Sequence, residues 1–409
     1  MKSTNLSSHS SFSRREKGNV FSAEAMLCFS FFLTIFAQPT VIKILAREGS
    51  FFVGIYLSSG ILMRLILSRF INQENANNIS KKFIKTYSFL MLLIVLSESY
   101  FSIHSTLIFS ILAGLASGSY MVFQLISDTA LAQMRNESES RLRNASRNIL
   151  ATNIGMFVGF VTGGIAAANV PSYMIFIIES AVLFIILLVM KFSRESPKEL
   201  VVEPPALPAS PMLKNKVEQD FFGIIGLFAI LSKVFSECSF RVIYPIYSFI
   251  TLEMTSKTYG LMMALSLAPG IALTLIGFDI KIFSKLSGFR SLIMLGIGTS
   301  CTLFFSFQSQ NLYSFSVLFT LGCLFSWAYS VLWRSLFASQ LQVHLKVAQR
   351  FSLEFKKNFS LLNASLAAAI SFFLGLCFQN KQIYQLTFLL FGFILSAILL
   401  QYANQSEAL

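Results

Sequence analysis

The sequence predicts an all-α polytopic membrane protein with twelve transmembrane helices, and three observations support this prediction. Of the 409 residues, 55% are hydrophobic and only 12% are charged, which is too apolar for a soluble protein of this size to cover its own surface. Several long stretches contain no Asp, Glu, Lys or Arg, and the longest is 291–333. The net charge of +13 is concentrated between alternate apolar runs, which is typical of membrane topology rather than of a nucleic-acid-binding surface.

Polar turns divide the chain into runs that match membrane-spanning helices, each of which needs about 20 mostly apolar residues. The hydrophilic stretch 193–219 lies between the sixth and seventh runs and contains five of the nine prolines, as a linker would. We therefore expect two pseudo-symmetric six-helix bundles. The predicted helices are 21–43, 50–69, 84–103, 106–132, 149–168, 172–192, 221–250, 258–280, 290–308, 313–339, 358–378 and 383–402.

The distribution of basic residues predicts the orientation in the membrane. A cytoplasmic N-terminus places 24 of the 32 Lys and Arg residues on the cytoplasmic side, in agreement with the positive-inside rule. Twelve spans then return the C-terminus to the cytoplasm. The predicted regions are a cytoplasmic tail at 1–20, a bundle at 21–192, a cytoplasmic linker at 193–219, a bundle at 220–402 and a cytoplasmic tail at 403–409. The first span is too long and too poorly bounded for a cleaved signal peptide.

The fifth predicted helix carries glycines at four-residue spacing, at Gly155, Gly159 and Gly163, followed by Gly164. Glycines at this spacing leave a flat stripe on which another helix can pack closely, and close packing drives helix association where lipid removes the hydrophobic driving force. The stripe can be a static packing face or a sliding contact between halves. The eleventh predicted helix offers a comparable set of small residues, namely Ala364, Ala368, Ser371 and Gly375.

This helix resembles helix 5 of the major facilitator superfamily, a family of twelve-helix transporters. The family motif has two glycines four residues apart, then Pro, two variable residues and a glycine pair. The sequence keeps Gly155, Gly159, Gly163 and Gly164, and Phe160 stands where the family has Pro. The intact motif is associated with exporters, so this departure removes the basis for inferring a direction of transport.

The loops after the second and eighth predicted helices extend the resemblance. The family usually has there a glycine, an acidic residue flanked by basic ones, and a second glycine with further basic residues. Arg69 keeps a basic position in the first loop, and Lys285, Gly288 and Arg290 keep such positions in the second, while Ser replaces the acidic residue in both. The resemblance implies gating roles for Arg69 and Lys285, but without the acidic partner found in relatives.

The seventh predicted helix carries charges inside the membrane. Lys233, Glu237 and Arg241 recur every fourth residue, and Tyr244 follows three residues later, so the four share one helical face. A charge near the bilayer centre costs about 2.5–3.5 kcal/mol on insertion scales, so such residues should face the interior of the bundle. The face can be a structural ladder or a substrate-binding surface, which we favour. In the family, helix 7 lines the central cavity together with helices 1, 4 and 10.

Other polar residues are candidates for coupling or gating. Glu24 lies near the start of the first predicted helix and can act as an interfacial anchor or a proton carrier, and Gln38, next to Pro39, can form hydrogen bonds with a solute in the cavity. Asp128 and Arg334 lie near the inner ends of the fourth and tenth helices, where they can form an inner gate or reach the interface as anchors. Arg64, Glu98 and Glu179 also lie in predicted spans, and the sequence assigns them no partner.

Together these features predict a secondary transporter for a small organic solute, working by alternating access. A slight excess of basic groups near the predicted centre favours an anionic or zwitterionic solute, such as an organic acid, a siderophore-like chelator or a peptide fragment. Export of amphipathic drugs and a non-transporting receptor are the alternatives. A proton or sodium ion can provide the coupling, and facilitated diffusion stays open. We expect a monomer in a bacterial inner membrane, with a eukaryotic organelle as the alternative.

Enzymatic chemistry has no support in the sequence. The histidines His9, His104 and His344 have no carboxylate at a short motif spacing, and no phosphate loop, nucleophile elbow or metal-ligand cluster is present. The five cysteines lie in apolar runs without a Cys-x-x-Cys pair. We therefore expect no catalytic residue, no metal, no cofactor and no nucleic-acid partner.

Overall fold

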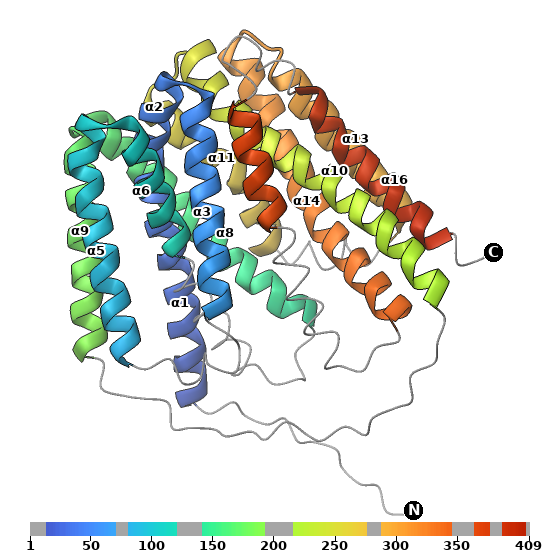
Figure 1. Ribbon diagram of the computed structural model, residues 1–409, viewed down its shortest axis with the longest axis horizontal. Helices are drawn as coiled ribbons and strands as arrows, with labels where there is room; N and C mark the ends of the chain where they lie inside the picture. Colours follow the sequence, from blue (N-terminus) through green and yellow to red (C-terminus); the bar gives the residue numbers. More distant parts are fainter. Residues whose placement is uncertain are drawn as a thin grey trace, which may run out of the picture.

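The computed structural model describes residues 14–70, 81–120, 141–192, 216–275, 288–345, 364–376 and 387–405, and all regular structure in these ranges is helical. The helices form two bundles side by side, with the N-terminal half on the left of Figure 1 and the C-terminal half on the right. Residues 1–13 and 406–409 of the predicted tails lie outside the described residues, as do residues 193–215 of the predicted linker.

The helices of the N-terminal half follow the predicted spans closely. Six predicted spans fall in this half, and the first of them is divided into two helices. The elements are α1 (Arg14–Phe36), α2 (Gln38–Glu48), α3 (Ser50–Phe70), α5 (Lys81–His104), α6 (Thr106–Ser119), α8 (Arg141–Asn169) and α9 (Ser172–Phe192).

The C-terminal half repeats the arrangement. Its elements are α10 (Lys216–Ile246), the π-helix η1 (Tyr247–Thr251), α11 (Ser256–Leu275), α13 (Phe289–Ser306), α14 (Leu312–Leu345), the helix Ala364–Leu376 and α16 (Gly392–Gln405). The π-helix begins two residues after Pro245. Proline has no N–H to donate to the carbonyl oxygen one turn earlier, so the regular α-helical ladder is already interrupted at this end of α10.

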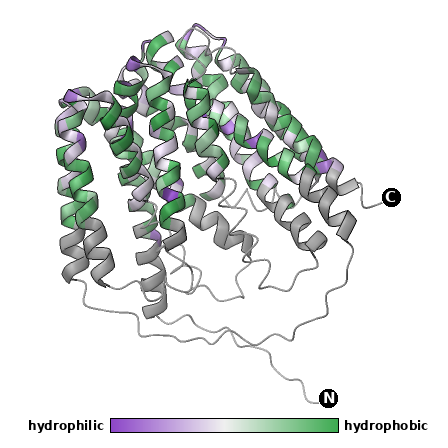
Figure 2. Ribbon diagram, viewed as in Figure 1, coloured by the Kyte–Doolittle hydropathy of each residue, from purple (hydrophilic) through white to green (hydrophobic). Residues whose placement is uncertain are grey.

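The surface of the two bundles is that of a multi-pass integral membrane protein. Six candidate spans among the described residues are long and apolar enough to cross a membrane. Large apolar side chains are exposed on the helices, among them Ile103, Leu275 and Met294. Figure 2 shows apolar residues along most of the described length of the helices. Such a surface would be unfavourable in water but suits contact with lipid.

The first predicted helix, 21–43, is broken at Ala37. Pro39 lies in the first turn of α2, where its missing N–H is not needed and its fixed φ angle suits a helix start. The α2 helix ends at Gly49, which has φ 129°, a left-handed conformation that glycine adopts without steric strain. The chain therefore turns directly from α2 into α3.

The glycine stripe of α8 lies against α1. A Cβ atom at Gly155 would lie 2.0 Å from the carbonyl oxygen of Cys28, and one at Gly163 would lie 2.1 Å from that of Phe36. No real Cβ atom approaches an oxygen so closely, so only glycine permits this packing. The stripe thus holds two helices of the N-terminal half together.

The two halves meet through two glycine pairs. Gly164 of α8 contacts Gly260 of α11, and Gly54 of α3 contacts Gly375, so closely that a Cβ atom on any of the four would lie 2.8–3.0 Å from the partner's Cα atom. Beside the second pair, Ser58 donates a hydrogen bond of 2.8 Å to the carbonyl oxygen of Ala368. These helix ends lie at the top of Figure 1. We call the two pairs the glycine seal.

Candidate functional site

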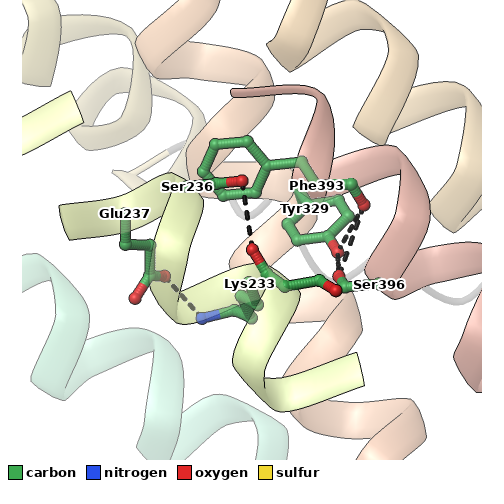
Figure 3. Close-up of polar contacts among 7 residues, drawn as sticks. Lys233, Ser236, Glu237, Tyr329, Phe393 and Ser396 are labelled. Atoms are coloured by element: carbon green, nitrogen blue, oxygen red, sulfur yellow. Dashed lines mark hydrogen bonds and ion pairs between the residues drawn. The ribbon is translucent and has the colours of Figure 1, made fainter. Parts of the chain in front are cut away.

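The charged face of α10 begins with a close ion pair. Lys233 Nζ lies 2.5 Å from Glu237 Oε1 across one helical turn, as Figure 3 shows. The Lys233 side chain is 9% exposed and that of Glu237 is 33% exposed. Lys233 also lies over the ring of Trp333, with Nζ 5.1 Å from the ring centroid, a favourable cation–π geometry. The carboxylate and the indole together compensate the desolvation of this lysine.

The opposite face of α10 is devoted to packing. Ser236 donates a hydrogen bond of 2.6 Å to the carbonyl oxygen of Leu389, and a Cβ atom at Gly392 would lie 2.6 Å from the carbonyl oxygen of Ser232. Nearby, the Tyr329 hydroxyl donates a hydrogen bond of 2.9 Å to the carbonyl oxygen of Phe393. It also contacts the Ser396 hydroxyl, and Figure 3 shows this group beside the ion pair.

A Tyr329→Phe variant tests the energetic value of this packing. The substitution keeps the ring and removes one hydroxyl, while Ser396 retains its hydrogen bond to Phe393. We therefore expect a loss of about 1 kcal/mol in the free energy of unfolding, the net value of a typical hydrogen bond. Thermal unfolding of the purified protein measures this loss, and an unchanged or raised melting temperature would contradict the assignment.

The outstanding feature of the site is a pair of arginines from opposite halves. Arg241 of α10 is exposed although it lies within a membrane-length helix. Arg64 of α3 is half-buried and lies close enough to Arg241 for their charges to repel, with Tyr56 as its other electrostatic neighbour. Neither guanidinium forms an ion pair with a described carboxylate. Two positive charges without a described acidic partner, one from each half, thus lie within electrostatic range of each other.

Tyr244, predicted to line the same face, lies in an aromatic cluster. It is 2% exposed, and its ring stacks on Phe319 at a centroid distance of 4.4 Å and lies 5.2 Å from Tyr259. Phe240 and Phe315 extend the cluster. These rings join α10 to α11 and α14, so the cluster contributes to the core of the C-terminal half.

Gln38 lies at the break between α1 and α2. Its Oε1 atom is buried and has no hydrogen-bond partner among the described residues, and α2 packs against α10, η1 and α11 of the other half. A buried amide oxygen without a donor is costly, so Gln38 is well placed to accept a hydrogen bond from a bound solute.

The remaining predicted residues are only partly described. Glu24 is half-buried in α1. Arg69 belongs to α3 and Arg334 to α14, but their side chains lie outside the described part of the structure. Asp128 and Lys285 lie wholly outside the described residues. The described residues contain no group of three or more His, Cys, Asp or Glu that could hold a metal ion.

No protein-family model and no curated protein matches the sequence. Solved structures do match the fold over nearly the whole chain. A mutant of the nucleoside transporter NupG aligns with a TM-score of 0.62 at 13% identity, covering 95% of this chain and 99% of its own. A bacterial homologue of the iron transporter ferroportin in an inward-facing state aligns with a TM-score of 0.65 at 14% identity, covering 96% and 99%.

A bacterial homologue of the human lysosomal transporter Spinster, inward-facing and occupied, aligns equally well. Its TM-score is 0.65 at 11% identity, with 96% of this chain and 98% of that chain covered. These similarities show that the chain has the fold of these transporter structures, as predicted.

Proposed function

We propose that this protein is a secondary transporter that moves a small organic anion by alternating access, with Arg64 and Arg241 as its anion-binding residues. The observation that carries the proposal is the arginine pair described above. Two guanidinium groups close together in a low-dielectric site repel each other, and an anion between them removes the penalty. A carboxylate or phosphate group also accepts paired hydrogen bonds from guanidinium.

The location of the pair supports transport rather than binding alone. Arg64 and Arg241 come from different halves, so a solute that contacts both would be released when the halves separate. In folds built from two repeats, the substrate site lies near the midplane between them, and the halves rock about it. The matched structures are named as a nucleoside transporter and as a homologue of an iron transporter. One fold therefore serves different substrates, and it does not identify the substrate of this protein.

The ion pair on α10 bears on the expected charge of the substrate. Glu237 already neutralises Lys233 at 2.5 Å, so the net positive charge of the site comes from the two arginines. This favours an anion, or a zwitterion held by its acidic end. The drug-exporter alternative gains no support, because the aromatic side chains around Tyr244 are packed against one another in the core.

The described conformation is, in this proposal, inward-facing. The glycine seal joins the halves at the end that the charge distribution places outside the cell. The ferroportin and Spinster homologues with the same fold were likewise captured inward-facing. We place the protein in a bacterial inner membrane and expect it to act as a monomer.

Uptake into proteoliposomes tests the proposal. The wild type is assayed with labelled mono-, di- and tricarboxylates, phosphorylated compounds, nucleosides and cationic dyes. It is then compared with Arg64→Gln and Arg241→Gln. A lost charge-assisted hydrogen bond costs about 1.5–3 kcal/mol, so we expect each variant to raise the KM for the transported anion about 10- to 150-fold.

Arg47→Gln serves as the matched control, because Arg47 is exposed near the end of α2. It should transport like the wild type. Size-exclusion profiles show whether each variant is folded. Transport of dyes alone, or unchanged anion kinetics in both arginine variants, would contradict the anion site. Specific binding without any uptake would indicate a receptor.

A further inference from the structure

We infer that Glu98 of α5 and Glu179 of α9 form a proton-binding site within the N-terminal half. Both residues are 2% exposed, and α5 and α9 pack along one another, as the left side of Figure 1 shows. The sequence leaves both acids without a partner, and the structure brings them together.

The hydrogen bonding of the pair is incomplete. The Tyr120 hydroxyl donates a hydrogen bond of 2.5 Å to Glu179 Oε1. The other oxygen of Glu179, Oε2, and Oε1 of Glu98 are buried and have no hydrogen-bond partner among the described residues. An unsatisfied buried carboxylate oxygen is costly. A proton on one of the two carboxyl groups turns an oxygen into a donor and removes one of the buried negative charges.

Among the described side chains of the neighbouring helices, no Lys or Arg is in a position to replace the proton. The described side chains of α6, α8 and α9 contain no Lys or Arg, and those of α5 contain only His104, whose ring packs on Tyr100 at the end of the helix. From α3, Tyr56 interacts electrostatically with both acids and with the cation Arg64. The two buried carboxylates interact electrostatically, and two buried negative charges without a described cation repel each other, so in this proposal the pair holds at least one proton.

Tyr56 connects this site to the arginine pair. It is buried, and it interacts electrostatically with Glu98, Glu179 and Arg64, while Arg64 interacts with Arg241. An anion between the arginines cancels positive charge near Tyr56 and thereby favours the protonated form of the acids. Binding of a proton should then raise the affinity for the anion, and the reverse. This link rests on the proposed function, whereas proton binding itself does not.

Thermal unfolding as a function of pH tests the proton site without any substrate. In the wild type, deprotonating the pair leaves buried charge in the folded state, while the unfolded chain ionises freely, so stability is present at low pH and is lost as pH rises. We expect a falling melting temperature between about pH 5 and about pH 9. The Glu98→Gln/Glu179→Gln double variant should lose most of this fall, whereas the exposed control Glu48→Gln should keep it.

Two outcomes would overturn the proton site. One is a double variant whose melting temperature falls with pH as in the wild type. The other is a wild-type melting temperature that sodium, but not a bulky organic cation, restores at high pH. If sodium has no such effect on the double variant, the pair is a metal-cation site.

The link to transport is measured separately, with a pH-sensitive dye inside proteoliposomes. Wild-type anion uptake should acidify the lumen, and the double variant should exchange anion for anion without acidification. Equal acidification by both would overturn the link. If no anion is transported but the melting behaviour is as expected, the proposed function fails and the proton site stands.

Discussion

Replacing Gly260 with leucine is expected to slow transport strongly while leaving the protein folded. A Cβ atom at Gly260 would lie 2.4 Å from the carbonyl oxygen of Phe160 and 2.9 Å from Gly164 Cα. Both neighbours are backbone atoms that cannot rotate away, so α8 and α11 must separate. Overpacking raises the free energy by about 1–3 kcal/mol. Only the conformation in which the glycine seal is closed is destabilised in this way. The population of that conformation should drop about 5- to 150-fold.

Spin labels report the expected opening. In a variant whose native cysteines are replaced, labels at Glu48 and Lys257 lie on opposite halves near the sealed end, and both positions are exposed. Their separation should lengthen with Gly260→Leu. Gly288→Leu is the matched control, because nothing lies within 4 Å of a Cβ atom there. Wild-type transport and an unchanged distance distribution in Gly260→Leu would show that the seal does not open during the cycle.

Glu237→Gln is expected to destabilise the protein far more than Lys233→Met. Removing Glu237 leaves the ammonium group of Lys233 unpaired in a side chain that is only 9% exposed, and breaking a buried pair in this way costs about 3–5 kcal/mol. Removing Lys233 leaves a carboxylate whose side chain is 33% exposed, so solvent compensates part of the loss. The apolar methionine also keeps its contact with Trp333.

Thermal unfolding of both variants and of the double variant Lys233→Met/Glu237→Gln gives the comparison. The double variant should recover most of the stability lost in Glu237→Gln, because it leaves no buried charge. Equal losses in the two single variants would mean that Lys233 is better solvated than its burial indicates.

The spans and the fold could be predicted from the sequence because lipid imposes a strong rule. A backbone in hydrocarbon must satisfy its own hydrogen bonds, so each long apolar run becomes a helix. The break at Ala37 has a visible cause in Pro39, but the interruption itself was missed in the prediction of one helix at 21–43. Proline at the start of a helix and proline that breaks a helix look alike in a sequence.

The partners of the charged residues could not be predicted, since they depend on how deep and how rotated each helix lies. Arg64 interacts electrostatically with Arg241, and Glu98 with Glu179, across helices far apart in the sequence. Lys233 and Glu237 pair within one helix, which is why periodicity could reveal them. The predicted gating roles of Asp128 and Lys285 stay predictions, because both residues lie outside the described structure.

The glycine seal has a consequence for how salt acts on the protein. Main-chain atoms meet main-chain atoms at Gly164–Gly260 and Gly54–Gly375, so closing this end requires no charged partner. Dissolved ions screen charge over about 10 Å at moderate ionic strength and leave van der Waals contact unaffected. Salt should therefore lower the affinity of the arginines for an anion without changing the rate at which this end opens. Affinity and the rate of the conformational cycle can then be varied separately.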